Sequence, residues 1–422
     1  MTDGCPGAVS RRRFLQGTGG AALVGGATGL FGACSSDDLG GARSASSTGA
    51  EGEHQYLAFR GPHQAGVTAL HQASSMMASF VVTAADRDEL QELFVTLTEE
   101  SERLMSGTPY DELDPAYPAL YTGHLGNPPP PADLSIVVSV GESLFDDRYG
   151  LADRKPVELE HMPFLANDRL DPERSHGDLL ISISSANEDT DLFALRQLMR
   201  VTRGRLVLHW MLDGYTRRAE AGPGEAGVRN LMGFVDGTAN LRPEDDDAMD
   251  RFVWVAEDDG EPAWAVGGSY HAVRVIRMLV EFWDRTRLSE QEALIGRKKD
   301  KGAPLDGEVE TDIPDFAADP DGEITPLDAH IRLANPRTAE TEDQLILRRG
   351  FSFSRGFDGN GQLDQGLAFV SYQRSLSKQF LPVQERLAGE PLEEYILPVG
   401  GGFFFALPGA TEGSYLGEAL VS

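Results

Sequence analysis

The sequence predicts an α+β protein made of two tandem ferredoxin-like domains. In the first half, apolar runs and helical stripes follow in the order strand, helix, strand, strand, helix, strand, which is the order of a ferredoxin-like unit. The second half repeats this rhythm of strands and helices. The chain has 422 residues, of which 41% are hydrophobic, so two domains with sizeable cores are within its reach.

Alternating and β-branched segments predict the strands of the first half at 79–83, 134–140, 178–184 and about 205–211. Helices are predicted over about 87–105 and 190–202, the first with Asp86 placed to cap it. Between them, residues 107–133 contain many prolines and glycines and are predicted to form a loop.

The second half is less regular. Strands are predicted near 263–266, 277–283, 345–353, 366–372 and 401–406, with 268–275 either a further strand or the run into 277–283. Helices are predicted over 289–296 and 375–387. A Gly-rich stretch at 222–227 suggests the boundary, so the expected organisation is a signal (1–34), a disordered linker (35–53), an N-terminal domain (54–221) and a C-terminal domain (222–422).

The first 34 residues have the features of an export signal. Arg11 and Arg12 form a twin-arginine pair, and the apolar run that follows is too short and too rich in glycine to span a membrane. Such signals export proteins that have already folded. Phe31 to Cys34 resembles a lipoprotein cleavage box, which leaves two alternatives: lipidation of Cys34, or plain cleavage nearby. The expected location is periplasmic, extracellular or anchored to the outer face of the cytoplasmic membrane.

Composition excludes several classes of function. The formal net charge of −30 argues against binding nucleic acid through its phosphates. With two cysteines, one of them in the signal, the mature chain has no internal disulfide, no CxxCH for covalent heme attachment and no Cys-rich zinc site. GxSxG, GxxxxGK[ST] and HExxH are absent from the sequence.

Three residues are candidates for chemistry, and each also has an ordinary structural interpretation. Asp236 lies in GFVDGT, where Asp-Gly is typical of a tight turn but also suits a general acid-base. His330 is either a surface or hydrogen-bonded residue, or a metal ligand. Arg348 follows apolar residues at a predicted strand, where a surface salt bridge is the alternative.

Nine segments, in order along the chain, resemble DyP-type (dye-decolourising) heme peroxidases, and in particular their exported deferrochelatase/peroxidase branch in bacterial iron uptake. They span residues 59–409 and are FRGPHQAG, SLFDDRYGL, SHGDLLISI, NLMGFVDGTAN, GGSYHAVRVIRM, EQEALIGRKKDKGAPL, DAHIRLANPR, LRRGFSF and GGGFFFALPG. One departure is Leu241 after Asn240, where relatives commonly have proline.

The resemblance implies two domains of antiparallel sheet with peripheral helices, and one non-covalent heme b held mainly by the second domain. It assigns Asp236 and Arg348 to catalysis, His330 to the heme iron as axial ligand, and Gly237 and Thr238 to cofactor binding. A carboxylate near the end of the chain, Glu393 or Glu394, is the expected partner of the His330 ring.

Three functions follow from the resemblance. The first is a peroxidase that reduces hydrogen peroxide and oxidises an organic donor. The second is a deferrochelatase that releases iron from heme and leaves the porphyrin intact, alongside an iron-uptake permease. The third is a non-catalytic heme carrier. A homo-oligomer is left open. The tryptophans and tyrosines either relay electrons to the surface or pack in the core; the four tryptophans are Trp210, Trp254, Trp264 and Trp283.

Overall fold

The computed structural model describes residues 54–111, 114–216 and 228–422. The predicted signal with Arg11, Arg12 and Cys34, the linker and the 222–227 boundary lie outside the described residues. Within the described ranges, no helix has the length and apolar character needed to cross a membrane.

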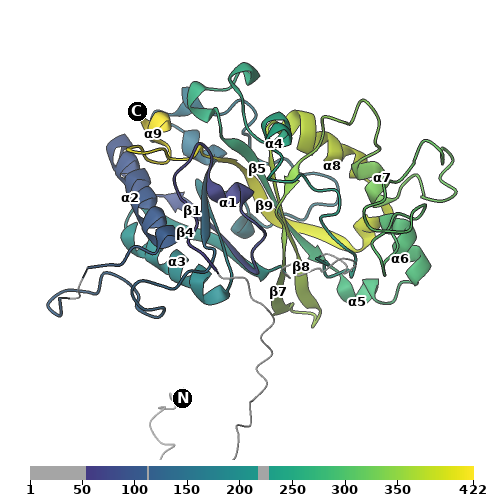
Figure 1. Cartoon of the computed structure of the whole chain (residues 1–422), viewed down its shortest axis with the longest axis horizontal. Helices are drawn as coiled ribbons and strands as arrows, with labels where there is room; N and C mark the ends of the chain where they lie inside the picture. The colour runs from purple at the N-terminus through teal and green to yellow at the C-terminus, as the bar shows by residue number, and fades with distance from the viewer. Residues whose placement is uncertain (1–53, 112–113, 217–227) are drawn as a thin grey trace, which may run out of the picture. The chain divides into compact units, whose positions relative to one another are not determined.

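The first half forms one antiparallel sheet in the order β4-β1-β3-β2, with α2 and α3 on its outer side (Figure 1). Its elements are β1 (Ser74–Val82), α2 (Arg87–Ser106), β2 (Ser135–Gly141), β3 (Leu179–Ser185), α3 (Glu188–Val201) and β4 (Leu206–Tyr215). Asp86 caps α2 by accepting a hydrogen bond from the backbone N–H of Glu89. The predicted ferredoxin-like order is confirmed, although β1 begins and β4 ends several residues beyond the predicted bounds.

The second half repeats the arrangement as β9-β5-β8-β7. Its longer elements are β5 (Ser269–Met278), α6 (Leu288–Ile295), β7 (Phe351–Phe357), β8 (Leu363–Gln373), α8 (Leu381–Leu387) and β9 (Ile396–Ala406). Shorter elements in the chain are α1 (Ala65–Thr68), α4 (Asp246–Phe252), α5 (Val280–Trp283), α7 (His330–Ala334), β6 (Leu347–Arg348) and α9 (Glu418–Val421). A π-helical turn, Leu376–Phe380, leads into α8.

Two predicted strands are wrong. Residues 263–266 form a 3₁₀ turn, Ala263–Ala265, in which Trp264 Nε1 donates a hydrogen bond to the carbonyl of Arg154. The predicted strand 277–283 ends at Met278, and its second part is helix α5. Both segments are short apolar runs, and a short apolar run fits a buried strand and a buried helical turn equally well.

The two sheets join along both edges. β2 pairs with β9 from Ser139↔Ala406 to Gly141↔Phe404, and β4 pairs with β7 at Tyr215↔Ser352. With the β5–β8 pairing, the strands of the described residues form a closed circuit of eight, to which the short β6 is added beside β8. Closure satisfies the backbone groups that edge strands would otherwise leave unpaired.

The closed circuit separates two hydrophobic cores. Inside it, one face of every long strand packs together, with Met77, Trp210, Val273, Phe353 and Phe404 among the buried residues. Outside it, a larger core lies beneath α2 and α3 and extends to β5 and β9. All four tryptophans are buried in these clusters or in a third one beside α5, which fits ordinary packing.

Strand β9 carries a glycine that permits a close approach of backbone. Gly401 has φ +114°. Its carbonyl accepts a hydrogen bond, at 2.7 Å, from the backbone N–H of His176 in the neighbouring 174–177 segment. A Cβ on Gly401 would collide with the carbonyl oxygen of Val273 on β5. This position therefore accepts only glycine without rearrangement.

We expect Gly401→Ala to lower the free energy of unfolding by about 2–4 kcal/mol, because it adds backbone strain to a collision within the sheet. Gly359→Ala, where a Cβ would meet nothing within 4 Å, is the matched control and should change stability by less than about 0.5 kcal/mol. Chemical denaturation measures both. Equal stability of the two variants would contradict the close approach.

Candidate active site

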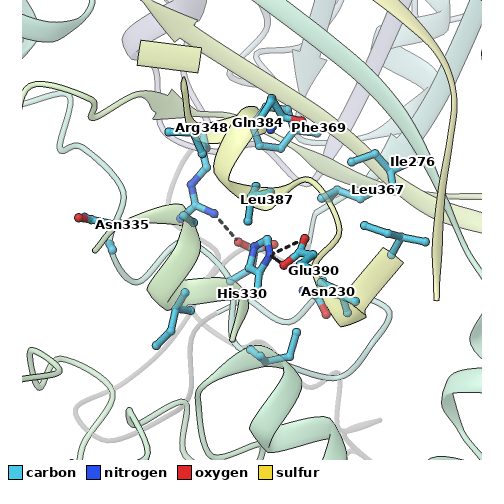
Figure 2. A pocket seen from close by; sticks show the side chains of 18 of the residues that line it. Asn230, Ile276, His330, Asn335, Arg348, Leu367, Phe369, Gln384, Leu387 and Glu390 are labelled. Atoms are coloured by element: carbon cyan, nitrogen blue, oxygen red, sulfur yellow. Dashed lines mark hydrogen bonds and ion pairs between the residues drawn. The ribbon is translucent and has the colours of Figure 1, made fainter. Parts of the chain in front are cut away.

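A cavity of about 320 Å³ lies on the outer face of the second sheet, away from the core inside the circuit (Figure 2). Strands β5 and β8 form one wall with Ile276, Leu367 and Phe369, and α8 adds Leu387. The remaining walls come from the 230–239 segment, from α7, and from residues 165–167 of the first half. The cavity is thus largely apolar, with a few polar groups placed in it.

His330 is the first residue of α7 and lines this cavity. Its Nδ1 lies 2.9 Å and 3.1 Å from the two carboxylate oxygens of Glu390, which is itself buried (Figure 2). Because a carboxylate accepts hydrogen bonds, a neutral His330 carries its proton on Nδ1 and leaves Nε2 as a lone pair. The side chain keeps 35% of its surface exposed and lines the cavity, and Nε2 has no hydrogen-bond partner among the described residues.

Two opposing effects set the pKa of His330. Burial disfavours the charged ring, but the negative charge of Glu390 and its hydrogen bond outweigh burial, so the pKa is raised above its ordinary value. Arg348 lowers this pKa and Asp236 raises it by smaller amounts. Both charged groups therefore lie within electrostatic reach of the ring.

The partner of His330 differs from the one predicted. Glu393 lines the cavity but accepts a hydrogen bond from the backbone N–H of Gly389, and it is Glu390, not Glu393 or Glu394, that bonds the ring. Glu390 begins the 3₁₀ turn Pro391–Glu394, which places its carboxylate under α7. Sixty residues separate it from His330, and no local pattern marks it in the sequence.

Asp236 and Arg348 meet at the same cavity. Arg348 Nη1 lies 3.3 Å from Asp236 Oδ1, and the two side chains keep 35% and 29% of their surface exposed. The chain turns at Gly237, which has φ +87°, and the N–H of Asn240 closes the turn on the Gly237 carbonyl at 3.0 Å. The turn interpretation and the functional interpretation of Asp-Gly are therefore compatible.

Asn240 ties this turn to strand β6. Its side-chain amide donates to the carbonyl of Arg348 and accepts from the N–H of the same residue, each at 2.8 Å. The two bonds fix the backbone of Arg348 relative to Asp236, 112 residues earlier in the chain. The sequence shows a departure from relatives at Leu241, the next residue, but no pattern in it marks Asn240 as a positioning residue.

The remaining predicted residues also line the cavity. Gly237 forms its wall, and Thr238 Oγ1 donates to Glu310 Oε1 at 2.9 Å, which turns the hydroxyl toward the 304–327 loop. Arg297 and Arg337 line the cavity too. Arg297 donates to the carbonyls of Gly302 and Glu310, whereas the guanidinium of Arg337 has no hydrogen bond or ion pair to another described residue.

Among the described residues, no group of three or more His, Cys, Asp and Glu side chains is arranged to hold a metal ion. His330 is thus a single imidazole that faces an apolar cavity, with an acid and a guanidinium nearby. This donor set suits an ion whose other ligands come from an organic ring.

Two family models match the chain: Dyp-type peroxidase, N-terminal, over residues 64–216, and Dyp-type peroxidase, C-terminal, over residues 227–411. The chain belongs to the Dyp-type peroxidase family. It is therefore an enzyme of the peroxidase type, and the sequence-based assignment to this family is confirmed.

Relatives agree with this assignment along the whole chain. The deferrochelatase of Escherichia coli (strain K12) is 46% identical over 416 residues, covering 98% of this chain and 97% of the relative. Ferric DtpA from Streptomyces lividans superposes with a TM-score of 0.78 at 34% identity, over 87% of this chain and 98% of that one. A DyP-type peroxidase from Cellulomonas bogoriensis matches with the same TM-score at 33% identity, over 88% and 99%.

We expect Glu390→Gln to lower the pKa of His330, because it removes the charge that raises it. The ion pair stabilises the wild-type fold below the ordinary histidine pKa of about 6.5, and this stabilisation is lost as pH rises through the raised value. Glu390→Gln should flatten that pH dependence. Nuclear magnetic resonance of the heme-free protein measures the pKa. Glu393→Gln is the control, and an equal effect there would contradict the assignment.

Proposed function

We propose that the chain is a heme b peroxidase that reduces hydrogen peroxide with Asp236 and Arg348 and oxidises an organic donor. One observation carries this proposal: His330, held by buried Glu390, faces the same apolar cavity as the Asp236–Arg348 pair. Membership of the peroxidase family supports it.

The cavity fits a non-covalent heme b. Apolar side chains on β5, β8 and α8 suit the faces of a porphyrin, and His330 supplies an open Nε2 for the iron. Arg337 has no acidic partner among the described residues, and with Arg297 it offers positive charge to the two carboxylates of heme. When bound, heme supplies a redox-active iron that accepts peroxide and stores oxidising equivalents.

On the His330 side, Glu390 fixes the orientation of the ring and the position of its proton. A carboxylate that accepts the Nδ1 hydrogen bond also increases the donor strength of Nε2. Because both carboxylate oxygens lie within 3.1 Å of Nδ1, rotation of the ring breaks these bonds. His330 therefore presents one nitrogen in one direction to the cavity.

Asp236, which lines the same cavity, moves a proton. Cleavage of the peroxide O–O bond releases water only if a proton leaves one oxygen and reaches the other. An ionised Asp236 accepts that proton and then donates it to the departing oxygen. Arg348, whose Nη1 lies 3.3 Å from Asp236 Oδ1, stabilises the negative charge that develops there. Asn240 holds Arg348 in place for this role.

We expect Asp236→Asn to lower kcat/KM for hydrogen peroxide by about 10²–10⁴-fold, because the amide cannot carry the proton. Heme content should stay at the wild-type level, since His330 and Glu390 are unchanged. Stopped-flow absorbance measures the reaction with peroxide. Asp250→Asn, an exposed change on α4, is the control. Wild-type turnover in Asp236→Asn would refute the proton-transfer role.

A second function is favoured by one comparison. The similarity to a deferrochelatase extends over 98% of this chain, which supports release of iron from heme with the porphyrin left intact. A non-catalytic heme carrier is the third alternative, and absence of peroxide turnover in the wild-type, heme-loaded protein would favour it.

Incubating the heme-loaded protein with a reductant and a ferrous chelator distinguishes these functions. A deferrochelatase yields chelated iron and an equal amount of fluorescent protoporphyrin. The peroxidase and deferrochelatase functions both predict peroxide turnover while Asp236 is intact, and only the deferrochelatase function predicts iron release. Chelated iron together with an opened porphyrin ring would contradict the second function.

We further infer export by the twin-arginine route, with an iron-uptake permease as a partner of the deferrochelatase function. Arg11, Arg12 and the short apolar run after them support export. Replacing both arginines with lysine should retain the protein inside the cell, as measured by fractionation. Continued export of that variant would exclude this route.

A further inference from the structure

Arg348 and Arg349 are consecutive but point to opposite faces of the sheet. In the pairing of β6 with β8, Leu347 is opposite Tyr372 and both belong to the core inside the closed circuit, whereas Arg348 lines the outer cavity. Side chains alternate along a strand, so Arg349 returns to the inner side. There it lines a second, separate cavity of about 30 Å³.

The walls of this second cavity are rich in hydroxyl groups. It is lined by four serines on β1, β2 and β3 and by the phenol of β8, namely Ser75, Ser135, Ser182, Ser184 and Tyr372. Ser75 Oγ lies 3.0 Å from Ser184 Oγ. Only one hydrogen can lie between those two oxygens, so the other hydroxyl hydrogen of the pair is free to donate elsewhere.

The positive charge of Arg349 lacks a negative partner in the structure. Its Nη1 donates to the carbonyl of Ala69 at 2.5 Å, and among the described residues no carboxylate lies within ion-pair distance of its guanidinium. No Asp or Glu lines the cavity. Burial raises the pKa of Tyr372, so that phenol stays protonated and supplies a donor rather than a counter-charge.

The nearby histidine does not supply charge either. Burial, with a contribution from Arg349, lowers the pKa of His71 to about 4, so this ring is neutral near neutral pH. Arg349 is half-buried, and a partly desolvated guanidinium without a counter-charge is unfavourable, because no attraction to an acid offsets its lost hydration. An anion from solution, surrounded by hydroxyl donors, would offset the unfavourable free energy of this unpaired charge.

We infer that this cavity binds one small anion of halide size, such as chloride, against Arg349. A volume of about 30 Å³ holds an object of the size of a single water molecule or halide, since one water needs about 10–15 Å³ on this measure. Sulfate or a larger organic acid is too big. The donors to the anion are the guanidinium of Arg349, one hydroxyl of the Ser75–Ser184 pair, and the hydroxyls of Tyr372 and Ser182.

Thermal unfolding at constant ionic strength tests this site in the full chain. When sodium gluconate is exchanged for sodium chloride, we expect the midpoint to rise by about 2 °C at a chloride concentration ten times the dissociation constant. Arg349→Gln should abolish the chloride-specific rise. Arg251→Gln, which removes an exposed arginine paired with Asp343, should retain it. An equal response in the wild type and Arg349→Gln would overturn the inference.

Because Arg349→Gln also removes the bond to Ala69, a second variant leaves the guanidinium in place. Ser75→Ala removes one hydroxyl of the wall and should raise the chloride dissociation constant about tenfold. Crystals soaked in bromide provide a direct view, with an anomalous peak expected beside Arg349. No peak there, or an unchanged dissociation constant in Ser75→Ala, would refute the site. Neither measurement depends on heme or on peroxidase activity.

Discussion

Closure of the two sheets into one circuit determines which face of each strand in the second half packs in the inner core and which face is left for the large cavity. β2–β9 and β4–β7 pairing joins the halves along both edges, so the inner faces of all the long strands share one core. The outer face of β5 and β8 is then left to form the wall of the large cavity. Side chains alternate between the two faces along β6 and the residue after it, so Arg348 lines the large cavity and Arg349 lines the small one inside the circuit.

The cavity gathers groups that the chain carries far apart. The 233–238 turn supplies Asp236, β6 supplies Arg348, α7 supplies His330, and the 3₁₀ turn after α8 supplies Glu390. The bonds between them are short and specific: Glu390 holds the imidazole, and Asn240 holds the backbone of Arg348. In the proposed function, His330 donates a nitrogen lone pair in this cavity and Asp236 moves a proton.

The repeated strand and helix order and the Asp86 cap could be predicted from sequence, because each has a local pattern. Motifs also singled out Asp236, His330 and Arg348, which the structure brings to one cavity. Glu390 could not, since the turn that carries it under α7 is set by tertiary packing. The strand predictions for segments 263–266 and 277–283 were wrong because apolar composition alone does not distinguish a short strand from a helical turn. Closure of the circuit could not be predicted either, because it depends on pairing between strands that are far apart in the sequence, and no local pattern indicates that pairing.

The central claim is that His330 presents Nε2 to a heme iron in this cavity. Absorption spectra of the purified protein reconstituted with heme, for the wild type and for His330→Ala, test it most directly. We expect a Soret band at stoichiometric heme in the wild type, and a lost or displaced band in His330→Ala with the fold intact by circular dichroism. A wild-type spectrum in His330→Ala, or no heme uptake by either protein, would contradict it.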